Sequence, residues 1–255
     1  MPRAHEPTAH VAWRGVRAWR FAWTLASVFV VESLILGLAL LPAALFWRLH
    51  LGALAGLATS ALGIVVLSMA LVPAYLIFAL ALMGLSAGAT ALLGWRPRPN
   101  ARMRIADLEP ELADWARYGI ISHVVRVLVG PMLRNTPLWV TYMRANGARI
   151  GRRVWVNSLD VTDHCLLDLG DDVVIGAGAH LSGHTVERGV VLTAPVVLGA
   201  GSVVGVNCHV EIDVVTGPGC QIGSLAMVPK GSRLEGGRTY VGVPVHPVDP
   251  EAASP

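Results

Sequence analysis

A six-residue repeat in the C-terminal half constrains the fold of this chain more than any other feature. An aliphatic residue or a threonine recurs at Leu192, Leu198, Val204, Val210, Thr216, Ile222 and Val228, and an earlier series contains Leu169, Ile175 and Leu181. Such a short period is typical of stacked rungs that share one continuous core. The sequence therefore predicts a repetitive all-β coil over residues 148–246.

The repeat is interrupted between Leu181 and Leu192, where the spacing is eleven residues instead of twelve. A loop or bulge is expected to leave the coil at this point, and it contains His184. Loops carried on rigid scaffolds are where binding and catalytic groups concentrate. We therefore expect the functional site at this interruption.

The N-terminal half is too apolar for an ordinary soluble protein. The chain is 54% hydrophobic and only 15% charged, and the excess lies in residues 21–95. Residues 21–46 carry one charge, Glu32, and residues 51–94 carry none. Each stretch is long enough to cross a hydrocarbon core of roughly 30 Å, so we predict an integral membrane protein.

Charge and length together suggest the topology. As one straight helix, residues 51–94 would measure about 66 Å, so we expect a break at Pro73. Arginines are enriched before the apolar region and after it, at Arg96, Arg98, Arg102 and Arg104. The positive-inside bias then places both ends, and the repeat domain, at the cytoplasmic face after two crossings. Part of 51–72 is expected to be re-entrant or to lie on the surface; three crossings are the alternative.

The connector before the repeat has helical patterning. An apolar stripe that includes Trp115 predicts a helix over 111–129, and a second helix is expected over 138–144. The first would suit a membrane interface or packing on the repeat domain. The predicted segments are a basic cytoplasmic arm (1–20), a transmembrane region (21–95), an amphipathic helical connector (96–147), the coil (148–246) and a disordered tail (247–255).

Composition excludes several classes of protein. The formal charge is only +3, and no basic-aromatic face is visible, so nucleic acid is not an expected partner. Three cysteines without paired spacing do not indicate a disulfide framework. Cys208 and Cys220 fall on small inward positions of the repeat, and only Cys165 lies off them. No metal site is predicted.

The glycine-bearing hexads resemble those of the hexapeptide-repeat acyltransferases, in which three hexads complete one coil of a left-handed parallel β-helix. The order of elements carries the resemblance: Leu169-Gly170-Asp171-Asp172-Val173, His180-Leu181-Ser182-Gly183-His184, an excursion, Pro195-Val196-Val197-Leu198-Gly199, and Gly242-Val243-Pro244. It is similar to the sugar O-acetyltransferase branch, in which a Gly-His at this break supplies the catalytic histidine. The implied fold is therefore a set of transmembrane helices followed by a left-handed parallel β-helix.

A closer resemblance is to the membrane-attached C-terminal region of poly-lysine-synthetase-type peptide synthetases. It rests on residues 133–137, 147–151 and 159–163, which read LRNTP, GARIG and LDVTD. In those proteins, membrane helices precede hexapeptide-like domains that join amino acids delivered as carrier-bound thioesters. This chain carries no adenylation or carrier domain, so the resemblance implies a stand-alone version.

The resemblance suggests roles for individual residues. His184 is the expected general base, because the usual pKa of histidine, about 6.5, suits proton transfer. His180 is the second choice, and His209 is expected to be structural. The candidates for the acceptor side or for orienting His184 are Asn157, Asp160, Asp163 and Glu187. The candidates for donor binding are Gly205 and Val206 near the thioester, and Ser224 and Lys230 near the coenzyme A backbone and phosphates.

These expectations describe a membrane-anchored acyltransferase that moves an acyl group, acetyl in the first instance, directly to a hydroxyl or amine. Acetyl-CoA or a phosphopantetheine thioester is the co-substrate, and no bound cofactor is predicted. The expected partners are the bilayer, two further copies in a homotrimer, and a carrier protein or synthetase. One alternative is a non-catalytic or peptide-bond-forming synthetase partner. Another is a γ-carbonic-anhydrase-like zinc enzyme, for which His180 and His184 lack a convincing third ligand.

Overall fold

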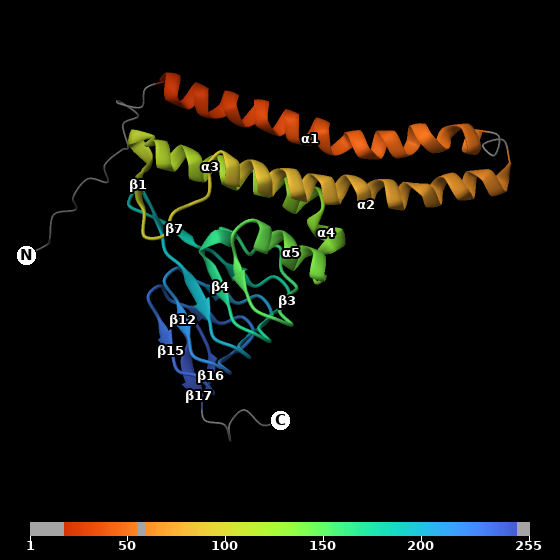
Figure 1. The fold of residues 1–255 in the computed structure, drawn as a ribbon. Coiled ribbons are helices and arrows are strands. Elements are labelled where there is room, and N and C mark those ends of the chain that lie inside the picture. Colours follow the sequence, from red (N-terminus) through yellow and green to blue (C-terminus); the bar gives the residue numbers. More distant parts are fainter. Residues whose placement is uncertain (1–17, 56–59, 249–255) are drawn as a thin grey trace, which may run out of the picture.

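Two long helices form an antiparallel hairpin at the N-terminal end of the structure (Figure 1). The computed structural model describes residues 18–55 and 60–248, so most of the predicted basic arm and of the predicted tail lie outside it. α1 (Ala18–Ala55) and α2 (Ala61–Leu92) pack along each other. Ser60 caps α2 by accepting a hydrogen bond from the Gly63 amide.

The structure corrects one expectation about this region. Pro73 lies inside α2, which is continuous from Ala61, and α1 likewise continues through Pro42. The described part of 51–72 is therefore helical on both sides of Ser60, and the predicted break at Pro73 is wrong. A proline removes one helical hydrogen bond and favours a kink, but both helices continue past their prolines.

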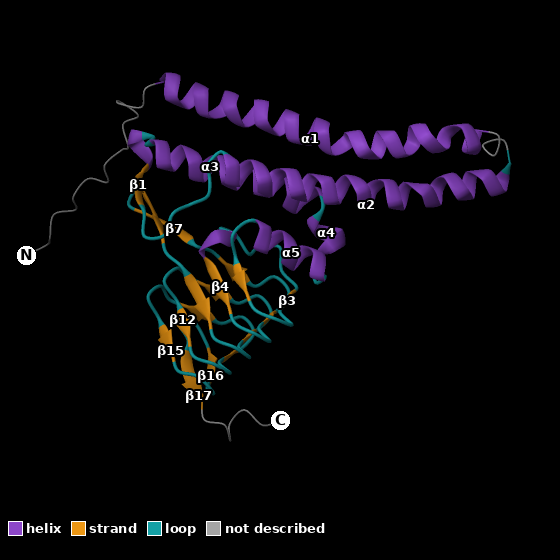
Figure 2. Cartoon of the chain, in the orientation of Figure 1, coloured by secondary structure: helices purple, strands orange, loops and turns teal. Residues whose placement is uncertain are grey.

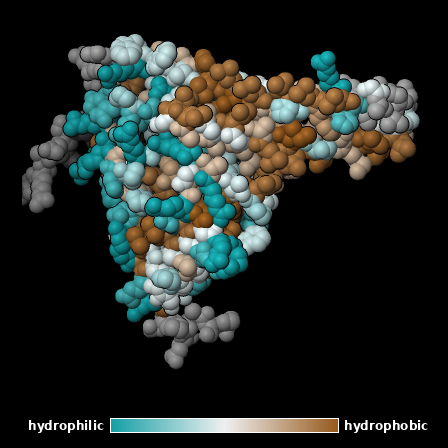
Figure 3. All heavy atoms as spheres, viewed as in Figure 1, coloured by the Kyte–Doolittle hydropathy of each residue, from teal (hydrophilic) through white to brown (hydrophobic). Residues whose placement is uncertain are grey.

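The hairpin exposes apolar side chains along most of its length. Figure 3 shows hydrophobic residues over the hairpin and mainly hydrophilic ones over the strand-rich domain. By length and composition, Trp19–His50 and Ala61–Leu92 could each cross a membrane. Only 22% and 11% of their most apolar windows are buried, unlike the core helix of a soluble protein.

The connector places three helices between the hairpin and the strands. These are α3 (Pro110–Leu128), α4 (Gly130–Leu133) and α5 (Pro137–Ala145), preceded by β1 (Arg102–Arg104) and the 3₁₀ turn η1 (Ile105–Asp107). The two predicted helices are confirmed, each within one residue at either end. α3 packs against both helices of the hairpin, and α5 packs against α2 and the first strands. One buried apolar core runs from the hairpin through these helices into the strands.

The rest of the chain is a left-handed parallel β-helix, as predicted, with three sheets as its faces (Figure 2). The first face contains β2 (Arg149–Ile150), β4 (Leu167–Leu169), β9 (Val196–Leu198), β12 (Val215–Thr216) and β15 (Arg233–Leu234). The second contains β3 (Trp155–Val156), β5 (Val174–Ile175), β10 (Val203–Val204), β13 (Gln221–Ile222), β16 (Thr239–Val241) and β17 (His246–Val248). The third contains β6 (His180–Leu181), β11 (His209–Val210) and β14 (Met227–Val228).

The strand register gives the length of a coil. Val203 pairs with Gln221, and Gln221 pairs with Thr239, so a regular coil takes eighteen residues, or three hexads. Val174 pairs with Val203, a separation of twenty-nine. Eleven residues are thus inserted in that coil, between β6 and β9. They form a hairpin of β7 (His184–Glu187) and β8 (Val190–Thr193), to which β1 adds antiparallel.

The repeat positions from Leu198 onward fill the interior. Leu198, Val204, Val210, Thr216, Ile222 and Val228 are all buried, as are the residues four positions further along from Val204 to Ile222. Leu192, which the sequence series included, lies instead in the β7–β8 hairpin, where it pairs with Thr185. The predicted interruption is therefore real, but the coil resumes only at Val196. Leu192 was assigned to the coil because the hydrophobic alternation of β8 continues the apparent repeat outside the coil.

The last strand closes the stack away from the helices. β17 turns back and pairs antiparallel with β16. It includes residues 247 and 248, which the sequence placed in a disordered tail; residues 249–255 lie outside the described part. The helical hairpin of α1 and α2 therefore lies at the end of the β-helix where the first coil is, and β17 lies at the opposite end (Figure 1).

Candidate active site

Two departures from the regular coil meet beside α3. The first is at Asp163, whose backbone adopts the left-handed conformation (φ 49°) just before the 3₁₀ turn η2 (His164–Leu166). The second is the start of β7, where the inserted hairpin leaves the coil at His184. Both follow the third face of the coil, one turn apart. They bring an acid and a histidine together that are separated by 21 positions in the sequence.

His184 and Asp163 form a short, oriented pair. His184 Nδ1 lies 2.5 Å from Asp163 Oδ2, and the two side chains are 28% and 4% exposed. A buried carboxylate accepts the Nδ1 proton, so the lone pair of the neutral imidazole is on Nε2. Within residues 18–55 and 60–248, Nε2 has no hydrogen-bond partner. It is therefore free to accept a proton from a substrate.

The carboxylate of Asp163 is held by further donors. The Gly183 amide donates to Oδ2 at 3.2 Å, and the Ser182 hydroxyl lies 3.3 Å from the same atom. The indole Nε1 of Trp115 donates to Oδ1 at 3.2 Å. A buried charge is tolerated only when it is hydrogen-bonded in this way. Asp163 is thus fixed from the coil and from α3.

Trp115 also contacts the histidine itself. Its ring meets the imidazole of His184 edge to face, with centroids 4.8 Å apart and planes at 67°. Such a contact is a favoured aromatic geometry. One side chain of α3 therefore fixes the acid by a hydrogen bond and the base by ring packing.

The environment changes the basicity of His184. Burial lowers the pKa of His184, but the hydrogen bond to Asp163 and the negative charge of that carboxylate outweigh it, so the pKa lies above its usual 6.5. Neutral imidazole is the form that acts as a base. The fraction of active base therefore rises as the pH increases through this raised pKa.

A small cavity lies between α3 and the coil in front of this pair. Its volume is ≈ 120 Å³. Trp115, Ser122 and Arg126 line it from α3, and Thr162 and His184 line it from the coil and hairpin. Pockets for drug-sized ligands are typically about 300–1,000 Å³. This cavity holds only a small group next to His184.

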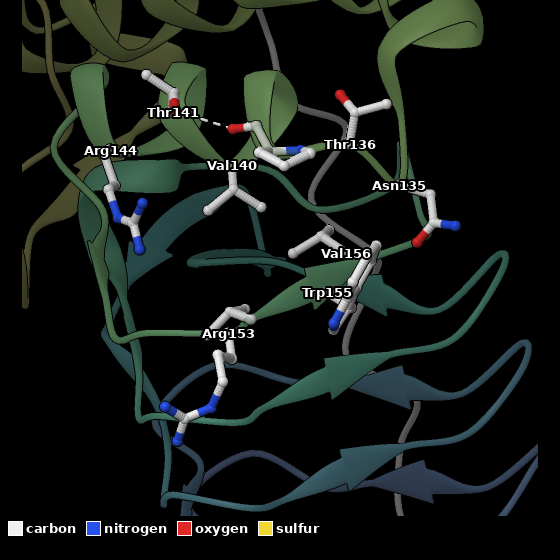
Figure 4. A pocket seen from close by; sticks show the side chains of 10 residues that line it. Asn135, Thr136, Val140, Thr141, Arg144, Arg153, Trp155 and Val156 are labelled. Atoms are coloured by element: carbon white, nitrogen blue, oxygen red, sulfur yellow. Dashed lines mark hydrogen bonds between the residues drawn. The ribbon is translucent and has the colours of Figure 1, made fainter.

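A second, separate cavity measures ≈ 380 Å³. The larger cavity lies between α5 and the first coil and is mainly apolar, with Trp155 on one wall (Figure 4). Its two cations are already engaged: Arg153 binds Asp172, and Arg144 donates to the carbonyls of Ile150 and Gly151. It contains no acid–base pair, so we place the chemistry at the smaller cavity.

The mouth of the smaller cavity carries charge. Arg126 Nη1 lies 3.6 Å from Asp160 Oδ1, and Arg126 Nη2 lies 2.8 Å from His123 Nδ1. Asp160 is therefore at the edge of the site, where its exposed carboxylate pairs with the arginine and does not contact His184. Of the predicted carboxylates, Asp163 is the one that orients the histidine.

A second histidine forms part of the cavity floor. His164 is 4% exposed, and its Nε2 donates to the Val161 carbonyl at 3.1 Å. Burial lowers its pKa to about 4, despite the nearby charge of Asp163. His164 is therefore neutral at pH 7 and contributes no positive charge to the floor of the cavity.

The structure separates the remaining predicted residues from this pair. Asn157 is half-buried on the first coil, and its side chain makes no hydrogen bond within the described residues. Glu187 ends β7 and pairs with Lys230, at the far end of the inserted hairpin. Gly205, Val206 and Ser224 share one corner of the coil, where a Cβ on Gly205 would lie 2.6 Å from the Ser224 amide. The third face lies between that corner and His184.

His180, the second choice for the base, points away from the site. It stacks on His209 across the third face, with ring centroids 4.6 Å apart and planes at 12°. Cys208 and Cys220 are buried in the coil, as expected, and burial raises the pKa of the Cys165 thiol to about 12. In the described part of the chain, no group of three or more His, Cys, Asp or Glu side chains could hold a metal ion.

Among the side chains that the sequence did not predict for the site, two hydrogen-bond to Asp163. Ser182 was quoted only as part of the segment before His184, and Trp115 only as a member of the apolar stripe of α3. An indole needs a partner for its N–H when it is buried, which was the available signal for Trp115. The identity of that partner depends on how α3 packs on the coil, which the sequence does not encode locally.

Comparison with known proteins gives limited matches. No family model matches the chain. Delta-poly-L-ornithine synthetase of Acinetobacter baumannii is 25% identical over 136 residues, which are 52% of this chain and 10% of that protein. This chain thus spans about a tenth of the length of its curated relative.

Several solved structures resemble the β-helix. A hexapeptide-repeat-containing acetyltransferase from Vibrio cholerae has a TM-score of 0.43 at 14% identity, over 50% of this chain and 87% of that one. Serine acetyltransferase from Neisseria gonorrhoeae has a TM-score of 0.35 at 20% identity, over 52% and 54%. The chain is thus similar over about half of its length to an amino-acid polymer synthetase, and these solved structures are acetyltransferases, the two kinds of protein that the sequence resembles.

Proposed function

We propose that this chain is an acyltransferase that moves an acyl group from a thioester to a hydroxyl or amine, with His184 as the general base. The observation that carries the proposal is the His184–Asp163 pair, which leaves Nε2 free at a small cavity. A base oriented by a buried acid is the arrangement that such a transfer requires. Acetyl-CoA is the donor we propose first, and a carrier-bound phosphopantetheine thioester is the alternative donor.

The reaction proceeds without an acyl-enzyme. His184 Nε2 takes the proton of the acceptor O–H or N–H while the acceptor atom bonds to the acyl carbon. The carbon–sulfur bond then breaks, and the thiolate leaves with the proton returned by His184. Asp163 stabilises the imidazolium that exists between these steps. The high pKa of the buried Cys165 thiol gives no support to a cysteine nucleophile.

The position of the proposed donor-binding residues supports an active site that is completed by another copy of the chain. Gly205, Val206 and Ser224 share a corner that lies across the third face from His184 in the same chain. Val206 is 45% exposed there, and the neighbouring Leu225 is 69% exposed. We propose a homotrimer in which this corner of one copy faces His184 of the next.

We also propose that the helical hairpin anchors the enzyme in a membrane. The exposed apolar side chains of α1 and α2 support this, because an apolar surface of that extent is unfavourable in water. A hairpin crosses twice and returns the chain to the side where it began. The arginines after α2 favour the cytoplasmic face for the β-helix, where acyl thioesters are made.

A second candidate function is a peptide-bond-forming or non-catalytic partner of a peptide synthetase. The 136-residue match to delta-poly-L-ornithine synthetase favours it. In that case the acceptor is the amine of an amino acid and the donor is bound to a carrier protein. The same His184 would serve as the base, so the two candidates differ in donor and partner and share the site.

The test uses the full chain, purified in detergent, with labelled acetyl-CoA and a whole-cell extract as the source of acceptor. His184→Ala should reduce release of free coenzyme A by about 10²- to 10⁴-fold, the usual contribution of a general base. His209→Ala is the matched control and should retain activity, because His209 lies on the third face away from the cavity. Equal rates for His184→Ala and the unchanged chain would exclude His184 as the base.

A further inference from the structure

α3 presents three different faces. Arg117 Nε donates to the Ser27 hydroxyl of α1 at 2.9 Å, and Tyr75 of α2 donates to the Leu128 carbonyl at 2.8 Å, so one face lies on the hairpin. Trp115 and Ser122 lie on the face that covers the cavity. A third face is open. The helix thus forms a wall between the hairpin and the site, with one exposed side that joins them.

The open face of α3 is mainly apolar. Ile120, Val127 and Leu128 are 38%, 54% and 43% exposed, and Met132 of α4 continues the row at 68%. Single exposed hydrophobic residues are common. These four side chains fall within about three turns of helix, beside a helical hairpin whose surface is apolar as well (Figure 3). Together they form an apolar strip, defined as Ile120, Val127, Leu128 and Met132, between the hairpin and the cavity mouth.

The cavity itself is small, and a few polar side chains project from its largely apolar wall. Thr162, Ser122, Arg126 and His184 contribute hydroxyl, guanidinium and imidazole groups to a volume of ≈ 120 Å³. That space admits a small head group, for which these polar groups are partners, and it is too small for a long apolar chain. The strip is open along the surface and entirely apolar. Cavity and strip together match a molecule with a polar head and an apolar tail.

We infer that the acceptor is a membrane-held amphiphile, a lipid or lipid-linked molecule whose head group carries the reacting hydroxyl or amine. This inference rests on the proposed acyl transfer and names its acceptor class. The tail stays beside the hairpin and the strip, and the head crosses about one helix diameter, roughly 10 Å, to reach His184 Nε2. Confinement of both partners to one surface raises the effective concentration of the acceptor.

The test uses the full chain reconstituted in vesicles made from the total lipid extract of the producing cells, with labelled acetyl-CoA. One sample contains vesicles alone, and a second also contains the small-molecule fraction of a cell extract. Label that enters the organic-soluble fraction with vesicles alone, and is lost in His184→Ala, is the expected result. Label found only in water-soluble products of the second sample would overturn the amphiphile and leave acyl transfer intact. No His184-dependent release of coenzyme A in either sample would overturn the proposed function itself.

A variant pair tests the role of the strip. Ile120→Gln with Val127→Gln should reduce labelling of the lipid fraction by about tenfold, with an unchanged unfolding temperature. Val243→Gln is the matched control, because Val243 is 69% exposed near the end of the last coil, away from α3. If the double variant fails to fold, the milder Val127→Ala should still lower lipid labelling by about threefold. Unchanged labelling in the folded variants would overturn the strip as the path of the acceptor.

Discussion

The regular coils after Val196 and the interrupted coils before it are built from the same hexads, yet they hold different features. In the later coils, strands pair at a constant displacement of eighteen residues, and every inward position is filled by an apolar or small side chain. In the earlier coils, the displacement is nineteen between Trp155 and Val174, twenty between Val161 and Leu181, and twenty-nine between Val174 and Val203. The acid, the base and the contacts with α3 all lie at these departures. The regular coils form the scaffold, and the interruptions bring together the His184–Asp163 pair on which the proposed chemistry rests.

The largest effect on the reaction rate is expected from a substitution in the interrupted coils. Asp163→Asn removes the charge that stabilises the imidazolium of His184, so the maximal rate should fall by about 10²- to 10⁴-fold. The pKa of His184 should also fall, because Asp163 is what raises it. The rising limb of the pH–rate profile therefore moves to lower pH, as measured by coenzyme A release between pH 5 and pH 9.

Asp160→Asn is the control for that change. Its carboxylate is exposed and pairs with Arg126 at the cavity mouth, so the rate should change by less than about threefold. Similar losses in the two variants would mean that charge near the cavity matters more than the orientation of His184. That result would contradict the assignment of Asp163.

The sequence predicted the regular coils better than the interrupted ones. Periodicity located the inward residues from Leu198 to Val228, because every coil repeats the same local environment. It also placed Leu192 inside, since the alternation of β8 imitates the repeat, and only strand pairing shows that β8 belongs to a hairpin. The sequence singled out His184 because it falls in the break, but which of the carboxylates lies beside it depends on a tertiary contact with Asp163.

The next prediction concerns the stability of the regular coils. A Cβ on Gly217 would lie 2.4 Å from the Gly236 amide nitrogen in the next coil, and that backbone cannot move without disturbing the stack. Gly217→Ala should therefore lower the free energy of unfolding by about 3 kcal/mol. Thermal or denaturant unfolding of the purified chain measures the change, and activity per folded molecule should be retained.

Gly119→Ala provides the comparison for the same chemical change. A Cβ there has no atom within 4 Å, and Gly119 lies in the middle of α3. Alanine should therefore stabilise the chain by about 0.5–1 kcal/mol. Destabilisation by both substitutions would show that glycine has a role in this protein other than permitting the close approach of coils.

The smallest effect tests the contact between α3 and the interrupted coils. Trp115→Phe keeps an aromatic ring against His184 and removes the N–H that donates to Asp163 Oδ1. Loss of one hydrogen bond of about 1 kcal/mol should reduce the rate by about fivefold. With one donor fewer, the negative charge of Asp163 interacts more strongly with His184 and raises its pKa further. The rising limb of the pH–rate profile should therefore move to higher pH, opposite to its shift in Asp163→Asn.

Trp155→Phe is the control. Trp155 is 52% exposed on the first coil, and its replacement should change neither the rate nor the pH–rate profile. An unchanged profile in Trp115→Phe would mean that α3 only covers the site, whereas a shift to higher pH makes the connector helix part of the machinery that sets the basicity of His184.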